Sequence, residues 1–174
     1  MGSRCLPPLL AALIALGVGG TTALPAAAAS PAAVTKTPCK AEHLKRYPGD
    51  STPPHWRYGE LDYSVTACLS QDPADWSTVA KWETNKVGQS NGIFIDSAKV
   101  QALQTDEDAQ TKSATYDGDF VVKTCIPFVE WPCGRTYREH LFFTVTVTKA
   151  TGAVQINRVS HSMLPPGLSL HSTP

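Results

Sequence analysis

The chain has 174 residues, with 15 basic and 15 acidic side chains, so its formal net charge is zero. A neutral chain lacks the basic surface that binds nucleic acid or an anionic membrane, and we expect neither as a partner. Its hydrophobic fraction of 42 % is sufficient for an ordinary globular domain.

Residues 1–29 are predicted to be a secretory signal peptide. Arg4 gives a positive start, residues 9–18 form an apolar run, and Ala27–Ala29 offers small residues for cleavage before Ser30. The apolar run is shorter than the roughly 20 residues that span a bilayer, which disfavours a membrane anchor. The alanine-rich composition of this segment is typical of a bacterium with a GC-rich genome. We therefore expect a secreted, extracellular protein.

Four cysteines remain once Cys5 is removed with the signal: Cys39, Cys68, Cys125 and Cys133. An even set in an oxidising compartment predicts two disulfides. Four cysteines allow three pairings, and we favour Cys125–Cys133 with Cys39–Cys68, because Cys125 and Cys133 bracket a loop between two strands that should pair. The chain has no closely spaced pair of metal-binding type, so we expect neither a metal nor a cofactor.

Residues 30–56 are predicted to be an extended leader. Five prolines interrupt every periodic pattern in it, apolar residues are sparse, and its net charge is positive. A leader of this kind is either a solvated linker or a segment that becomes ordered when it binds a partner. Residues 57–174 are expected to form the β-rich domain.

Alternating apolar and polar residues predict strands over most of that domain. Residues 142–148 and 153–157 alternate on either side of a turn at 149–152, which predicts a β-hairpin, and residues 120–125 and 61–69 predict two more strands. Further expectations are a helical turn that runs into a strand over 76–87, a turn at 88–92, one or two strands over 93–103 and a polar loop over 104–112.

About six or seven short strands with two cross-links predict an all-β fold, a small antiparallel β-sandwich. The alternative is an α+β domain, in which a short helix from 72–87 packs on one curved sheet.

No catalytic motif is recognisable, and we expect no enzyme. The five histidines are scattered, and none shares a known motif with a serine, cysteine or carboxylate. The acidic runs 106–108 and 117–119 lack the alternating ligand positions of a known calcium-binding loop. They are interpreted as solvated turns.

The loop closed by Cys125 and Cys133 is the sharpest local feature. Two prolines should hold its residues 128–131 in a fixed extended form, which lowers the entropy lost on binding. In ring size and proline content this loop resembles the reactive loop of Bowman–Birk-type protease inhibitors. That resemblance implies an alternative function, a secreted protease inhibitor.

Trp56 and Trp131 lie beside prolines in predicted loops, where large aromatic side chains either anchor a binding surface or cap the ends of the sandwich. We expect the protein to bind other secreted proteins. The candidate contact residues are Lys36 and Lys40 in the leader, Trp56, and Phe128, Glu130 and Trp131 in the cysteine-closed loop.

The chain has a characteristic order of parts: a signal peptide, a proline-bearing leader and a compact disulfide-linked β-domain without a catalytic motif. This layout resembles that of the small adaptor subunits of antibacterial umbrella toxin particles secreted by actinobacteria. The resemblance implies a non-enzymatic adaptor in a hetero-oligomer, whose leader inserts in a lectin-like subunit while its β-domain grips a large scaffold subunit.

Overall fold

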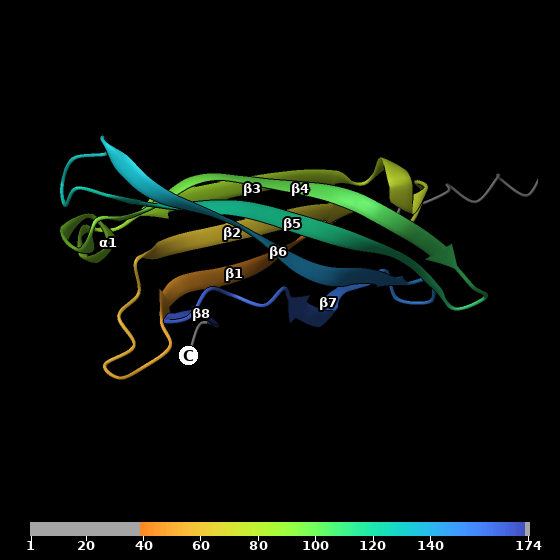
Figure 1. Ribbon diagram of the computed structural model, residues 1–174. Coiled ribbons are helices and arrows are strands. Elements are labelled where there is room, and N and C mark those ends of the chain that lie inside the picture. The colour runs from red at the N-terminus through yellow and green to blue at the C-terminus, as the bar shows by residue number, and fades with distance from the viewer. Residues whose placement is uncertain (1–38, 173–174) are drawn as a thin grey trace, which may run out of the picture. The chain divides into compact units, whose positions relative to one another are not determined.

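The computed structural model describes residues 39–172, which form a two-layered β-sandwich (Figure 1). One antiparallel sheet has the strand order β3-β2-β1-β8, and the other has the order β4-β5-β6-β7. The strands are β1 (Lys40–Asp50), β2 (Gly59–Ala67), β3 (Ser77–Thr84), β4 (Ile93–Glu107), β5 (Thr111–Cys125), β6 (Cys133–Thr148), β7 (Ala153–His161) and β8 (Leu168–His171).

The predicted all-β antiparallel sandwich with two disulfides is therefore confirmed, with eight strands where six or seven were expected. The α+β alternative is wrong, because the described residues contain one α-helix of six residues, α1 (Lys86–Asn91), and one 3-10 turn, η1 (Pro73–Asp75). In the described part of the chain, no helix is long and apolar enough to cross a membrane.

The core lies between the two sheets and follows the alternation in the sequence. In β2 every second residue from Leu61 to Ala67 is buried, and in β6 every second residue from Leu141 to Val147 is buried. Because side chains of a strand alternate between its two faces, one face of each sheet contributes to the core.

Gly118 of β5 allows a close approach between the sheets. A Cβ at this position would lie 2.9 Å from Cζ of Tyr63, a fully buried residue of β2 in the other sheet. The Tyr63 ring also lies 6.2 Å from that of Phe143, which in turn stacks on Tyr116 at 5.6 Å. The missing side chain therefore makes room for the central aromatic of the core.

Strand β1 lies inside residues 30–56, the stretch expected to be an extended leader. Its first seven residues pair with β2, and its last four pair with β8. Leu44 faces the core, and Pro48 is among the most buried side chains, so residues 40–50 are part of the domain. The sequence pattern hid this strand because Pro48 and Gly49 lie where β1 changes partner.

Two further expectations differ from the structure, and one strand was not expected. Residues 88–92, read as a turn, are mostly helix α1, which Gly92 ends in the left-handed conformation with φ of 67°. The polar run 104–112, read as a loop, continues β4 and opens β5 around a tight turn at Asp108. Strand β8 was not expected at all, because its four residues are too short for a periodic signal.

The first disulfide, Cys39–Cys68, is confirmed. It joins the residue before β1 to the residue after β2, with Cα atoms 4.2 Å apart. The signal peptide and residues 30–38, including Lys36, lie outside the described residues.

Candidate functional site

The second predicted disulfide, Cys125–Cys133, is also confirmed and closes the loop between β5 and β6. The two cysteines face each other across the sheet with Cα atoms 3.9 Å apart. We call residues 125–133 the stapled loop.

Helix α1 fixes the stapled loop from one side. The main-chain N–H of Phe128 donates to the main-chain oxygen of Gln89 at 2.8 Å. The main-chain N–H of Cys125 donates to the main-chain oxygen of Gly92 at 2.7 Å. A Cβ on Gly92 would lie only 2.2 Å from the Cys125 oxygen, so glycine is needed for this approach. The helix is itself capped by Asn85, whose side chain accepts from Gly88 N–H.

The loop is not extended throughout, and the expectation for residues 128–131 is wrong at Phe128. The Val129 N–H donates to the Ile126 oxygen at 3.0 Å, and Phe128 between them has a positive φ of 60°. The chain therefore reverses at Phe128 before it runs on to Trp131. The proline pattern could not reveal this turn, because one of the hydrogen bonds that hold it, from Phe128 N–H to the Gln89 main-chain oxygen, comes from α1.

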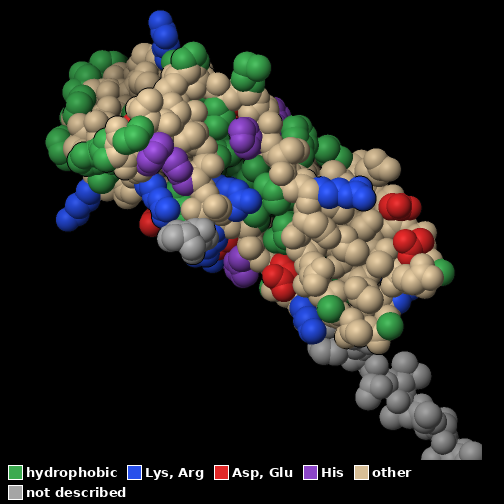
Figure 2. Space-filling view, turned by 90° about the horizontal axis from the view of Figure 1, so that it is seen from below, with side chains coloured by type: hydrophobic (Ala, Val, Ile, Leu, Met, Phe, Trp, Pro, Cys, Tyr) green, Lys and Arg blue, Asp and Glu red, His purple; other side chains and the backbone are tan. Residues whose placement is uncertain are grey.

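Apolar side chains of the stapled loop project into solvent. Trp131 is 78 % exposed and Phe128 is 70 % exposed, while Ile126 and Val129 are half exposed. Figure 2 shows hydrophobic side chains gathered at one end of the domain. Large exposed apolar patches are typical of interaction surfaces, which makes this loop the candidate site. Glu130 beside Trp131 is exposed as well.

The other candidate residues do not join the stapled loop. Trp56 is half exposed in the connection between β1 and β2. Lys40 begins β1 beside the Cys39–Cys68 disulfide, whereas the stapled loop lies at the end of the sandwich where β1 finishes (Figure 1). The structure thus separates the lysine of the leader from the aromatic residues of the loop.

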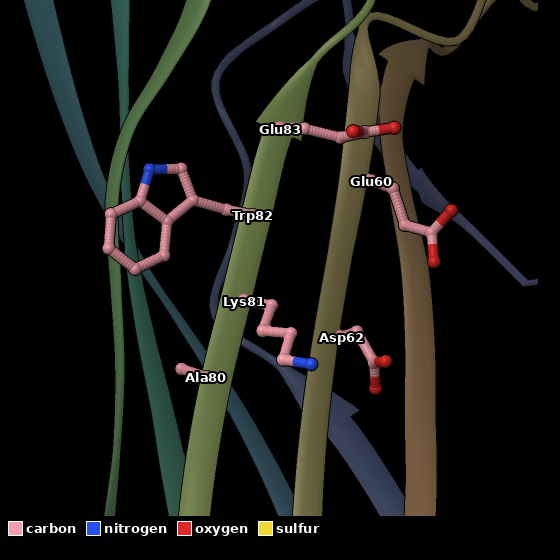
Figure 3. A pocket seen from close by; sticks show the side chains of 6 residues that line it. All are labelled: Glu60, Asp62, Ala80, Lys81, Trp82 and Glu83. Atoms are coloured by element: carbon pink, nitrogen blue, oxygen red, sulfur yellow. The ribbon is translucent and has the colours of Figure 1, made fainter.

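A hollow on the outer face of β2 and β3 carries mainly charged residues (Figure 3). Glu60 lies directly opposite Glu83, and such like-charged cross-strand pairs repel each other. Lys45 offsets the repulsion, because its Nζ lies 2.8 Å from the Glu60 carboxylate. A hydrogen bond from Lys45 to this carboxylate holds the pKa of the lysine above its ordinary value. Trp82 projects to the opposite side of β3 from these charges.

Two histidines pair with carboxylates that lie far away in the sequence. Nδ1 of His140 lies 2.9 Å from the carboxylate of Asp117, which is nearly fully buried, and Nδ1 of His43 lies 3.0 Å from Asp62. The sequence analysis missed both pairs because each joins neighbouring strands. Within residues 39–172, no group of three or more His, Cys, Asp or Glu side chains is placed to hold a metal.

The acidic run 106–108 has a structural role at the tip of the β4–β5 hairpin. The Asp108 carboxylate accepts from the N–H groups of Thr111 and Gln110, and these hydrogen bonds lower its pKa. Glu107 pairs with Lys149 at 2.7 Å, which lowers the pKa of the Glu107 carboxyl. These contacts tie the hairpin tip to the end of β6.

Comparison with protein-family models, with curated proteins and with solved structures finds no match for this chain. Chemically, the stapled loop offers a fixed apolar surface for burial against another molecule. In the outer hollow, Glu60 pairs with Lys45 and Asp62 contacts His43.

Proposed function

We propose that this chain is a secreted, non-enzymatic protein-binding module and that the stapled loop is its contact surface. One observation carries the proposal: a loop with a fixed backbone exposes two aromatic and two aliphatic side chains to solvent by half or more. Side chains exposed to this extent contribute little to the stability of the fold, because they bury little surface within the domain.

The rigidity of the loop supports binding as much as its composition does. The disulfide and the hydrogen bonds to α1 hold the loop before any partner arrives. Less conformational entropy is then lost on association, so a small surface can reach useful affinity. Trp131 and Phe128 are the expected hot spots, and truncating such a residue typically weakens binding by about 2–4 kcal/mol.

The extracellular location is part of the proposal. It is supported by the two disulfides, which persist in oxidising environments, and by the signal-like residues 1–29.

The adaptor role in an umbrella toxin particle stays a prediction that extends this proposal. An adaptor needs two separate contact regions. The stapled loop would be one of them, and residues 30–38, which precede the Cys39–Cys68 disulfide, would be the other. The protease-inhibitor alternative receives less support, because an inhibitor that imitates a substrate lies extended in the protease cleft, whereas this loop reverses at Phe128.

The experiment is affinity capture from the culture supernatant of the source organism, with a tagged chain of residues 30–174 as bait and quantitative mass spectrometry as readout. The test variant is Phe128→Ser with Trp131→Ser. The matched control is Val79→Ser, which changes an exposed apolar residue of β3 outside the loop. We expect one or more proteins to be captured by the wild type and the control and to be lost with the test variant.

A partner recovered equally well by the loop variant would contradict the proposed contact surface. Self-association of the bait that the loop variant abolishes would show instead that the loop contacts a second copy of the chain. Deletion of residues 30–38 tests the adaptor role, because it should release one partner and retain the partner that the loop binds. Nanomolar inhibition of a serine protease, unaffected by this deletion, would favour the inhibitor.

A further inference from the structure

A second surface, separate from the apolar side chains of the stapled loop, is a cleft between the ends of the two sheets. Its volume is about 270 Å³, and we call it the end cleft. Since a water molecule occupies about 30 Å³ of liquid, the end cleft has room for a ligand of ~9 non-hydrogen atoms. A ligand of this size is smaller than most drug-like molecules.

The walls of the end cleft are apolar and come from both sheets. Ile93 and Val122 contribute from β4 and β5, and Leu168 contributes from β8. Val122 is only 2 % exposed, so the floor belongs to the packed core. The segment before β8 is held in place, because the Ser51 N–H donates to the Gly167 oxygen at 3.0 Å. The cleft therefore has fixed walls.

The polar side of the cleft contains a tyrosine and a carboxylate in contact. The hydroxyl of Tyr58, a residue only 5 % exposed, donates to the carboxylate of Asp50. Burial, reinforced by the nearby carboxylate, raises the pKa of Tyr58 to about 12. The hydroxyl is therefore protonated at neutral pH and donates to the Asp50 carboxylate.

Neighbouring cationic groups do not neutralise this carboxylate. Within residues 39–172, Asp50 has no ion-pair partner. His55 and His171 lie nearby, but their ring nitrogens contact the main-chain oxygen of Asp50, at 3.3 and 3.0 Å. The Arg57 guanidinium lies over the ring of Tyr47, 4.6 Å from its centroid.

From these features we propose that the end cleft binds a small primary amine with an apolar body of about the size of a phenethyl group. The ammonium group pairs with Asp50 beside Tyr58, and the apolar body packs on Ile93, Val122 and Leu168. Apolar walls with a few fixed polar groups are the usual composition of small-molecule sites. This inference goes beyond the proposed protein-binding function and is independent of it.

The test compares three ligands that share one skeleton and differ in charge: phenethylamine, phenethyl alcohol and phenylacetate. Each is titrated into the isotope-labelled chain of residues 30–174 while amide chemical shifts are followed by NMR. We expect shifts at Ile93, Val122, Thr124 and Leu168 with the amine. We also expect affinity for the amine about tenfold above that for the alcohol, because hydrogen bonds to charged groups are the stronger ones. Phenylacetate should not bind, because its charge repels Asp50.

Two variants separate charge from shape. Asp50→Asn keeps an oxygen that can accept from Tyr58 and removes the charge, so affinity for the amine should fall about tenfold to that for the alcohol. Asp75→Asn removes an exposed carboxylate from η1 and should leave both affinities unchanged.

Equal affinity for all three ligands, shifts confined to residues outside the cleft, or unchanged amine binding by a folded Asp50→Asn chain would each overturn the proposal. The comparison of the three ligands on the wild-type chain tests the preference for a positive charge even if the Asp50→Asn chain fails to fold.

Discussion

Gly118 is the position where the smallest change of side chain tests the packing between the two sheets. An alanine Cβ would lie 2.9 Å from Cζ of Tyr63 and 3.1 Å from both Cε atoms. A favourable carbon contact is about 3.5–4.0 Å long, so the ring would have to move. Tyr63 is fully buried, and its hydroxyl donates to the main-chain oxygen of Asp119 at 3.3 Å. The ring therefore has little room to move.

We expect Gly118→Ala to lower the free energy of unfolding by about 1–2 kcal/mol. Over-packing a core destabilises by about 1–3 kcal/mol. The ~0.5–1 kcal/mol that alanine gains over glycine within a strand offsets only part of this loss.

The assay is equilibrium unfolding in urea with both disulfides intact, where a loss of stability at unchanged m-value lowers the midpoint. Gly134→Ala is the matched control, because its Cβ would lie 3.6 Å from the nearest atom, an ordinary contact, and we expect no loss of stability. In a Tyr63→Leu background the clash is removed, so Gly118→Ala should be nearly neutral, with a coupling energy of about 1 kcal/mol or more. Wild-type stability of Gly118→Ala, or an equal loss in both backgrounds, would refute the packing argument.

Three further outcomes are expected. Replacing both cysteines of Cys39–Cys68 by serine should destabilise the domain by about 3.6 kcal/mol, against about 2.6 kcal/mol for Cys125–Cys133, because the first disulfide closes the longer segment of the unfolded chain; urea unfolding of the two variants checks this order. Burial raises the pKa of Tyr116, and that of Tyr58 with help from Asp50, to about 12. Their contribution to stability is therefore complete below the ordinary tyrosine pKa of 10 and is lost as pH rises towards 12; thermal unfolding across this range should show a smaller decline for Tyr58→Phe than for wild type. Gly92→Ala places a side chain at a positive φ and against the Cys125 oxygen, so hydrogen exchange should show loss of protection at Cys125 and Phe128, the amides that α1 anchors, while exchange in β6 is unchanged.

The parts of the fold that sequence predicted are those where apolar and polar residues alternate along a strand, whether the apolar face is buried throughout, as in β2, or only in part, as in β6 and β7. The alternation of β2 and of the β6–β7 hairpin is local information, because each residue goes to one of two faces. The Cys125–Cys133 disulfide follows from the same logic, since pairing of β5 with β6 brings both ends of the loop together. The place of Trp131 in a loop was predictable from its neighbouring proline, but its exposure was not, because a tryptophan there could equally cap the end of the sandwich.

The parts that sequence analysis missed depend on contacts between distant segments. Strand β1 has few buried side chains, and its two partners bind different halves of it, so no local period reveals it. The reversal at Phe128 is held in part by the main-chain oxygen of Gln89 in α1, a helix too short to predict. The end cleft joins Asp50 to residues of β4, β5 and β8, and therefore exists only in the assembled sandwich.

The pairing of β1 with β8 sets the order in which this domain can fold. Gly49 and Ser169, which face each other across these strands, are separated by 120 residues. Such non-local pairing is slow to form, and it must wait until residues 168–171 have emerged. A chain that is made or exported from its N-terminus therefore stays incomplete until β8 is free. Neither disulfide involves β8, so both can form beforehand and shorten the search for this final contact.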